Sequence, residues 1–309
     1  MDKKKKLPLF RQKGFQLFLM NLPFFVLVFI LCYLPLFGWS YAFVDFKPGL
    51  KLSQMNFVGF KYFSKMFADR IALREIGRVM LNTLGINMLG YLFSPLAMFF
   101  AMFLTEMRSK GFQKFVQTTT TLPNFVSWVT VYSVAFALFS VSDGLVNHVL
   151  LDLGVIDTEI NFLISTDFLW LKMVLWGVWK GTGWSAILYF AAISAIDQEL
   201  YEAAKVDGAG RFRMMWHITL PQLLPTFFVL LIMSIGNFLN NGMEQYLLFS
   251  NPMTASKLEV LDLYVYNQGL IKAQYSYTTA VGMLKSIIGI ILVFGANRLS
   301  KTVRGYGIM

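Results

Sequence analysis

Residues 200 to 221, LYEAAKVDGAGRFRMMWHITLP, form a polar stretch between two long apolar segments. Asp197 is a typical N-cap, and the alanines and early acidic residues that follow favour a short helix as far as Val206. Gly208 and Gly210 end that helix, because glycine favours a bend over a continued helix. A helix followed by such a bend forms a compact knob whose side chains suit recognition of another protein surface rather than catalysis.

Individual side chains in this stretch support recognition. Ala203 and Ala204 are small enough to let their helix approach a second surface closely. Glu202 can accept hydrogen bonds or pair with a basic group of a partner, and Gly208 allows a bend that a Cβ atom would obstruct. Residues 211 to 217 can form a second short helix before the next apolar run.

The spacing within this stretch resembles the EAA loop of ABC importer permeases. The family pattern is E-A-A, three residues, G, nine residues and I-x-L-P, and the chain matches it at Glu202, Ala203, Ala204, Gly208, Ile218, Leu220 and Pro221. The flanking segments 179–184 (WKGTGW) and 221–225 (PQLLP) resemble the carbohydrate branch, particularly the LplB-like oligosaccharide permeases. The similarity runs from about residue 23 to about residue 304.

The resemblance implies a type I importer permease whose short helix docks in a groove of a separate ATPase and moves when the ATPase dimer closes. Asp207 and Arg211 would be contacts at the rim of that groove. The ATPase-coupling residues implied in this way are Glu202, Ala203, Ala204, Asp207, Gly208, Arg211, Ile218, Leu220 and Pro221.

The composition is that of a membrane protein that crosses the bilayer several times. Of the 309 residues, 56% are hydrophobic and only 14% are charged, whereas about a quarter of a soluble domain is charged. The net charge of +10 is concentrated partly in residues 3–13, before the first apolar run. We interpret this charge as a determinant of membrane orientation and not as a nucleic-acid site.

Several other functions are excluded or disfavoured by the sequence. The single cysteine, Cys32, permits no internal disulfide, and His148 and His217 have no metal-ligand spacing around them. We predict no catalytic set and no metal site. Residues 14–44 contain no Asp, Glu, Lys or Arg, a run too long for a signal peptide, so we expect a retained first span.

We predict an all-α protein with six membrane spans and both termini in the cytoplasm. A basic segment, 1–16, precedes a permease domain over 17–298, and a tail follows over 299–309. The spans are expected at about 17–43, 79–104, 115–140, 169–194, 222–242 and 277–297, with a cytoplasmic coupling loop at 197–221. In this orientation the cytoplasmic segments hold fifteen Lys and Arg residues and the outer segments nine.

Polar residues within or beside the spans are candidates for the substrate pathway, because an unpaired charge in lipid is unfavourable. Lys180 lies among tryptophans, whose faces can stack on sugar rings, although a snorkelling lysine with interfacial tryptophans explains the pattern equally well. Asn237, Asn241 and Glu244 would share one helical face. The candidates are Trp176, Trp179, Lys180, Trp184, Asn237, Asn241, Glu244 and Gln245, whereas Lys172 and Lys285 are expected to be structural.

No phosphate-binding G-x-x-x-x-G-K-[ST] motif occurs, so the chain has no usual ATP site and is expected to be a transport subunit without enzyme activity. The resemblance implies further partners: a second homologous permease, two ATPases that carry ATP and Mg²⁺, and an extracellular solute-binding protein. It also implies a multi-pass protein of the cell membrane of a Gram-positive bacterium, importing an oligosaccharide or glycan fragment.

Alternatives remain open at this point. An ABC permease for peptides or amino acids would share the EAA loop. An ion-coupled secondary transporter would require acidic residues at the bilayer centre and inverted repeats, and no acidic residue lies well inside a predicted span.

Overall fold

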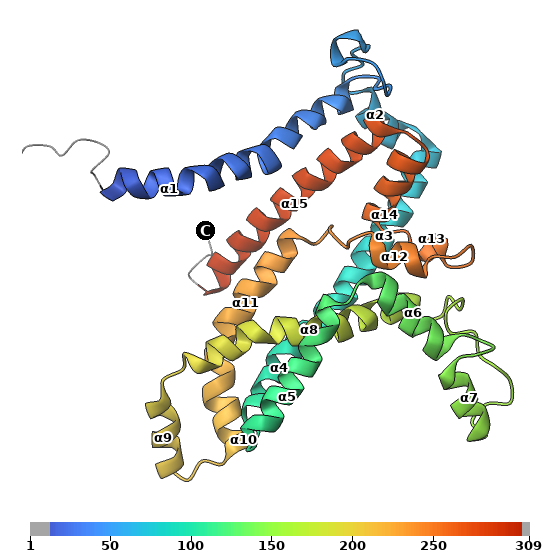
Figure 1. Cartoon of the computed structure of the whole chain (residues 1–309). Helices are drawn as coiled ribbons and strands as arrows, with labels where there is room; N and C mark the ends of the chain where they lie inside the picture. The colour runs from blue at the N-terminus through green and yellow to red at the C-terminus, as the bar shows by residue number, and fades with distance from the viewer. Residues whose placement is uncertain (1–12, 305–309) are drawn as a thin grey trace, which may run out of the picture. The chain divides into compact units, whose positions relative to one another are not determined.

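The computed structural model describes residues 13–304 of the chain (Figure 1). The fold is 76% helix, and within the described residues it contains no strand beyond an isolated bridge between Val44 and Phe57. These residues form two compact units, 13–65 with 268–283 and 66–267 with 284–304. Most of the predicted basic segment 1–16 and the end of the predicted tail lie outside the described residues.

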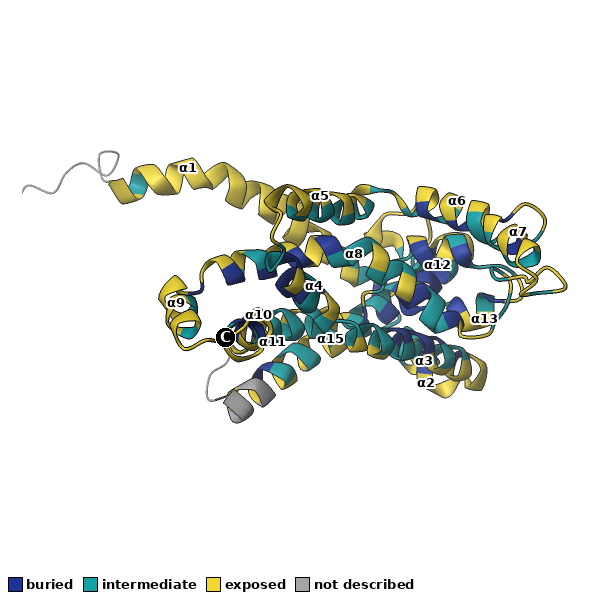
Figure 2. Cartoon of the chain, turned by 90° about the horizontal axis from the view of Figure 1, so that it is seen from below, coloured by how far each residue is buried: buried dark blue, intermediate teal, exposed yellow. Residues whose placement is uncertain are grey.

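The first unit begins with a long helical segment, Lys13–Phe43. It consists of α1 (Lys13–Val28), a π-helical turn (Phe29–Tyr33) and a 3-10 helix (Leu34–Phe43). None of the residues of α1 is buried, as the exposed colouring in Figure 2 shows. The apolar surface of α1 is therefore available to lipid or to a partner.

The same unit is closed by polar contacts between distant segments. The Ser276 hydroxyl donates to the carbonyl of Val44 at 2.7 Å and accepts from the N–H of Phe46 at 2.9 Å. The hydroxyl of Tyr62 donates to Asp45 at 2.8 Å, and burial, with the neighbouring Asp45 carboxylate, raises the pKa of this phenol. This unit also contains α2 (Lys61–Ala68) up to residue 65, short helical turns at Leu52–Gln54 and Asn267–Ile271, and the start of α15 (Tyr275–Arg304).

The second unit contains most of the remaining helices. They are α3 (Arg70–Leu92), α4 (Pro95–Thr105), α5 (Lys110–Thr121), α6 (Trp128–Phe139), α7 (Leu145–Asp152), α8 (Leu169–Ser194), α9 (Gln198–Val206), α10 (Arg211–Met214), α11 (Leu220–Gly236), α12 (Glu244–Phe249), α13 (Ala255–Leu258) and α14 (Leu261–Tyr266).

Helix α8 is the centre of this unit and packs against α3, α4, α5 and α11. Small residues permit the close approach: Ala97 and Ala101 of α4 face Ala186 of α8 in one buried cluster. A Cβ atom on Gly183 would overlap the backbone of Thr120 on α5, so only glycine fits there. Helix α8 therefore provides the packing surface that these four helices share.

Among residues 13–304, four helical segments are long and apolar enough to cross a membrane, and five if one bent pair is counted as a span. The four are Lys13–Phe43, Arg70–Thr105, Arg211–Gly236 and Tyr275–Arg298, which correspond to the predicted first, second, fifth and sixth spans. Helix α8 coincides with the predicted fourth span but is less apolar, because it carries two lysines and four tryptophans.

The predicted third span is not a straight helix. Helix α5 continues into a 3-10 turn (Leu122–Phe125), and α6 then departs at 106°. Pro123 lies within the turn, and the Ser127 side chain accepts a hydrogen bond from the N–H of Thr130 as the N-cap of α6. Local sequence therefore favours the bend on both sides, through Pro123 before it and the N-cap Ser127 after it.

Two prolines inside long helical segments are each preceded by a π-helical turn. The turn Phe29–Tyr33 precedes Pro35, and the turn Met215–Thr219 precedes Pro221. Proline lacks an N–H and its ring clashes with the carbonyl four residues earlier, and a wider turn accommodates both effects. As a result α10, the turn and α11 form one segment, Arg211–Gly236, rather than two separate helices.

Candidate functional site

The EAA stretch folds as a capped helix followed by a glycine turn. Asp197 is the N-cap of α9, and its side chain accepts a hydrogen bond from the N–H of Glu199 at 3.0 Å, as predicted. At the other end, the N–H of Ala209 donates to the carbonyl of Ala204 at 2.8 Å and that of Gly208 to Lys205 at 3.0 Å. This pair of bonds is a Schellman motif, with Gly208 in its left-handed position.

The requirement for glycine at position 208 is conformational. Its φ is +76°, and no atom of this chain lies within 4 Å of the place where a Cβ would be. A side chain would therefore strain the backbone without meeting anything in this chain. The open space beside Gly208 is free to receive another molecule.

The exposed face of this knob is more apolar than the motif alone indicates. Val206 is 88% exposed and Phe212 is 72% exposed, on either side of the glycine turn. Glu202, Ala203 and Asp207 are also exposed, as Figure 2 shows for α9 as a whole. Val206 and Phe212 therefore present apolar area beside the glycine turn that a partner protein could cover.

The other predicted coupling residues hold the knob to the rest of its unit. Ile218, Leu220 and Pro221 lie at the junction of the π-helical turn with α11. The hydroxyl of Tyr201 on α9 is 2.8 Å from that of Thr219 in the same turn. This hydrogen bond links α9 to the turn that precedes α11.

Arg211 also contacts its own chain. Its guanidinium donates to the carbonyl of Glu106, at the end of α4, at 3.3 Å. Arg211 remains exposed, so this contact leaves donors available for a partner.

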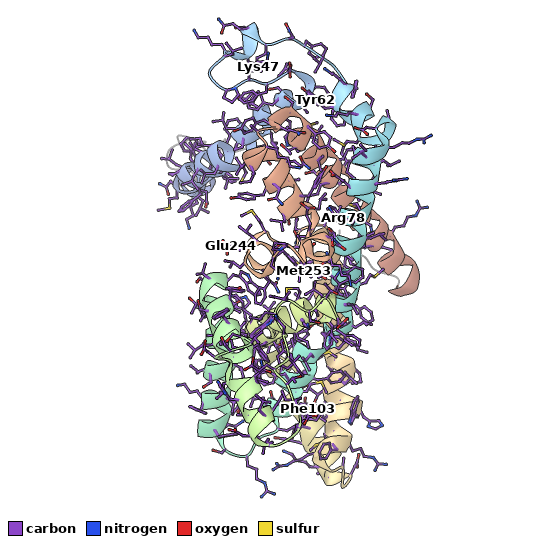
Figure 3. All side chains as sticks on the ribbon, turned by 90° about the vertical axis from the view of Figure 1, so that its right-hand side faces the viewer. Lys47, Tyr62, Arg78, Phe103, Glu244 and Met253 are labelled. Carbon is purple, nitrogen blue, oxygen red and sulfur yellow. The ribbon has the colours of Figure 1, made fainter. Side chains whose placement is uncertain are left out.

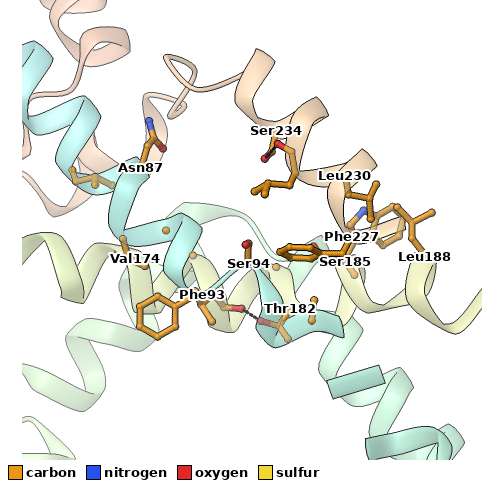
Figure 4. Close-up of a pocket in the computed structure, with 18 of the residues that line it drawn as sticks. Asn87, Phe93, Ser94, Val174, Thr182, Ser185, Leu188, Phe227, Leu230 and Ser234 are labelled. Atoms are coloured by element: carbon orange, nitrogen blue, oxygen red, sulfur yellow. Dashed lines mark hydrogen bonds between the residues drawn. The ribbon is translucent and has the colours of Figure 1, made fainter. Parts of the chain in front are cut away.

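A cavity of about 680 Å³ lies between α3, α4, α8, α11 and α12. In Figure 4, Ser94 comes from the turn between α3 and α4, Thr182 and Ser185 from α8, and Ser234 from α11. Asn87, Gln245, Tyr189 and Tyr246 complete its polar lining, and the remaining lining residues are apolar or glycine. The volume is within the range of small-molecule sites, and the lining combines apolar groups with hydroxyls and amides.

Two of the predicted pathway residues line this cavity, Trp184 and Gln245. Gln245 is buried, and its amide donates to the carbonyl of Met173 at 2.8 Å. Trp176 and Trp179 lie instead beside a separate apolar cavity, where Trp176 packs edge-on against Phe139.

Lys180 is held by the bend between α5 and α6. Its ammonium donates to the carbonyls of Pro123 at 3.1 Å and Asn124 at 2.7 Å, and it lies 5.6 Å from the ring centre of Trp128. It adds a donor to the carbonyl of Pro123, which also accepts from the N–H of Val126 at 3.2 Å, and it supplies a donor to the carbonyl of Asn124 at the bend.

The polar stripe after the fifth span is not a helical face. Helix α11 ends at Gly236, and residues 237 to 243 are non-helical, so Asn237, Asn241 and Glu244 do not follow helical spacing. The carboxylate of Asp262 accepts hydrogen bonds from the N–H groups of Asn241 and Gly242 at 2.9 and 3.0 Å. These bonds satisfy two N–H groups of the non-helical segment that follows α11.

The side chains of that stripe point to different surroundings. Asn241 exchanges hydrogen bonds with Asn87 of α3 at 2.9 and 3.1 Å. Asn237 and Glu244 are exposed, and Glu244 is labelled at the edge of the ribbon in Figure 3.

The two lysines expected to be structural have partners within the chain. Lys285 forms an ion pair with Asp262, and Lys172 donates to the carbonyls of Phe162 and Ser165 at 3.0 and 3.2 Å. Gly289 of α15 packs near α11, since a Cβ atom there would lie 3.6 Å from the carbonyl oxygen of Gly236. These contacts fasten α8, α14 and α15 to their neighbours.

Comparison with known proteins decides the family. Residues 93–305 match the model of the binding-protein-dependent transport system inner membrane component. The chain belongs to this family. It is 42% identical to Protein LplB of Bacillus subtilis (strain 168), over 92% of this chain and 88% of that protein.

Other relatives place this permease in the carbohydrate branch. The polygalacturonan/rhamnogalacturonan transport system permease protein YteP of Bacillus subtilis (strain 168) is 41% identical, over 99% of this chain and 94% of that protein. A bacterial ABC transporter involved in import of the acidic polysaccharide alginate has a chain that is 33% identical, with a TM-score of 0.82, over 94% of this chain and 97% of its own. It has also been solved with an alginate pentasaccharide-bound periplasmic protein. The prediction that this chain is an ABC permease of the carbohydrate branch is confirmed.

Two features of this permease were not predicted from its sequence. Val206 and Phe212 were not singled out, although two apolar residues within a polar loop are a visible signal. The hydroxyls of Ser94, Thr182 and Ser234 were missed because single serines and threonines in apolar helices carry no spacing signal, and only packing shows that they surround one cavity.

Proposed function

We propose that this chain is one of two permease subunits of an ATP-driven importer for an oligosaccharide or glycan fragment. It spans the membrane six times with both termini in the cytoplasm, at the cell membrane of a Gram-positive bacterium. An extracellular solute-binding protein delivers the cargo, and two ATPase subunits, which carry ATP and Mg²⁺, supply the energy.

The exposed α9 knob is the observation that carries this proposal. Its motif residues Glu202, Ala203 and Ala204 lie on a short helix whose end projects Val206 into solvent. An isolated apolar side chain at a helix end is unfavourable in water and gains free energy when a partner covers it. The ATPase groove is the partner, and Gly208 keeps the turn narrow enough to enter it.

The path for the cargo includes the cavity between α3, α4, α8 and α11. Trp184 and Phe227 supply apolar faces for sugar rings, and Thr182, Ser185 and Gln245 supply polar groups for hydroxyls. Closure of the ATPases moves α9, and the Tyr201–Thr219 contact passes the movement to α11, which forms one wall of the cavity.

Affinity purification from its own membrane in mild detergent, followed by mass spectrometry, tests the assembly. We expect a P-loop ATPase and a second six-span permease to accompany the chain. A homo-oligomer that transports without any ATPase would contradict the proposal and favour a secondary transporter.

A matched pair of variants makes this test specific for α9. Val206→Asp places a charge where the ATPase should cover an apolar group, so we expect loss of the ATPase and retention of the second permease. Val155→Asp is the control, because Val155 is 65% exposed in a predicted outer segment. Equal recovery of the ATPase with both variants would contradict docking through α9.

A further inference from the structure

The cavity between α3, α4, α8 and α11 has no charged lining. Its 680 Å³ are bounded by apolar residues, glycines, hydroxyls, amides and aromatic rings, and none of the lining residues is Asp, Glu, Lys, Arg or His. A carboxylate that entered it would leave water without meeting a cation from this chain. Such a transfer is strongly unfavourable.

The lysines of the adjoining helices cannot supply the missing cation without breaking contacts that they already make. The ammonium groups of Lys180 and Lys172, both on α8, are held by pairs of backbone carbonyls. Lys285 on α15 is paired with Asp262. None of these three lysines lines the cavity.

Three hydroxyls of the cavity wall present acceptors, and the hydroxyls of Ser185, Tyr189 and Tyr246 also line it. Those of Ser94, Thr182 and Ser234 donate to the carbonyls of Tyr91, Val178 and Leu231 in their own helical segments, at 2.8, 2.6 and 2.7 Å. Each oxygen therefore keeps lone pairs available after its proton is used.

Gln245 adds another acceptor to the wall. Its Nε2 donates to the carbonyl of Met173 at 2.8 Å, so its Oε1 remains available to accept. Sugar hydroxyls can donate to such a wall. A carboxylate can only accept, so it could use the O–H donors of the wall but would meet the lone pairs of Ser94, Thr182 and Ser234 unfavourably, with no cation to offset its desolvation.

We propose that the part of the cargo that passes this cavity is uncharged: a stretch of neutral sugar units that donates hydroxyl hydrogen bonds to Ser94, Thr182, Ser234 and Gln245. This inference rests on the proposed function. It adds that the cavity of this permease selects the cargo by its charge. It sets this chain apart from the related importer of the acidic polysaccharide alginate.

The test uses the complete importer in proteoliposomes with its own binding protein. Neutral oligosaccharides and uronate oligosaccharides of equal length are the probes, and ATP-dependent uptake is expressed per molecule of sugar-loaded binding protein. This normalisation removes the preference of the binding protein from the comparison. We expect neutral oligosaccharides to be taken up at least about tenfold faster, the ratio that corresponds to about 1.4 kcal/mol.

Equal or faster uptake of the uronate probes, or a binding protein that loads only uronates, would overturn the inference while leaving the importer intact. ATP-dependent uptake of neither kind would overturn the proposed function, and this inference with it. The wild-type comparison needs no variant and so does not depend on a variant that folds.

A charge placed in the wall provides a second readout. Ser185→Lys introduces a cation into the cavity, and we expect the ratio of uronate to neutral uptake to rise. Ser194→Lys is the matched control, because Ser194 lies on the same helix, is exposed and is outside the cavity. An unchanged ratio in Ser185→Lys, in protein that transports at all, would contradict the inference.

Discussion

At the level of single residues, some positions of the coupling motif require a particular backbone conformation, and others require only that the side chain is exposed. Gly208 adopts a left-handed conformation, with φ of +76° and open space around it. Gly210, two residues later, has φ of −74°, which any residue can adopt. We therefore expect Gly210 to tolerate substitution by a residue with a Cβ atom, and Gly208 not to.

We predict that Gly208→Val abolishes uptake while the protein stays in the membrane. A left-handed conformation costs a residue with a Cβ roughly 1–2 kcal/mol, so the turn opens and Val206 and Phe212 leave their positions. Uptake in cells lacking the wild type, with membrane levels measured by immunoblotting, tests this expectation.

Two substitutions serve as controls for Gly208→Val. Gly210→Ala should preserve uptake because that site has neither strain nor a close neighbour. Gly208→Asn should lose less than Gly208→Val, since asparagine tolerates this conformation better. Normal uptake by Gly208→Val would exclude the coupling role of this turn.

At the level of elements, α8 has two roles that explain its lower hydropathy. One side packs against α4 through small residues such as Ala186, and another lines the cavity through Thr182 and Ser185. Lys180 extends from the same helix to the bend between α5 and α6. A helix surrounded by protein and cavity need not be as apolar as one that faces lipid.

We predict that Lys180→Met destabilises the bent α5–α6 segment. The carbonyl of Asn124 would lose the ammonium that donates to it, whereas that of Pro123 would keep the N–H of Val126. A buried carbonyl left without a donor costs about 1–3 kcal/mol where no water replaces it. A lower thermal unfolding temperature in detergent would reveal this loss. Lys205→Met is the matched control, because Lys205 is exposed on α9.

The alternative role of Lys180, contact with the cargo, has a different signature. If uptake fell in Lys180→Met while the unfolding temperature stayed at the wild-type value, the lysine would act on cargo and not on the bend. Lys180→Arg should retain stability, because a guanidinium can donate to both carbonyls.

At the level of the whole molecule, the orientation proposed from charge can be tested with single cysteines. Cys32 is the chain's one cysteine, so Cys32→Ser gives a clean background. We predict that a cysteine in place of exposed Glu202 reacts with a membrane-impermeant thiol reagent only after the cells are permeabilised. A cysteine in place of exposed Asp152 should react in intact cells.

Labelling of both positions from the same side would contradict an arrangement in which α7 and α9 lie on opposite sides of the membrane. Labelling of Glu202→Cys in intact cells would exclude contact between α9 and a cytoplasmic ATPase. The unchanged uptake of the Cys32→Ser background is the control for both results.

Local features of this protein could be predicted from sequence because their causes are local. The N-cap Asp197 and the glycine turn depend on neighbours within a few residues, so motif and structure agree. The bounds of α8 match the prediction as well. Family membership follows for the same reason, since the EAA spacing lies within one short segment.

The contacts of the polar side chains could not be predicted from the sequence and are seen only in the tertiary structure, because their partners are distant in the chain. Asp262 accepts hydrogen bonds from the N–H groups of Asn241 and Gly242, twenty-one and twenty residues away, in the segment that follows α11, and it forms an ion pair with Lys285. Lys180 reaches carbonyls fifty-six and fifty-seven residues away. Periodicity within one helix cannot report such contacts, and packing alone brings scattered hydroxyls of several helices around one uncharged cavity.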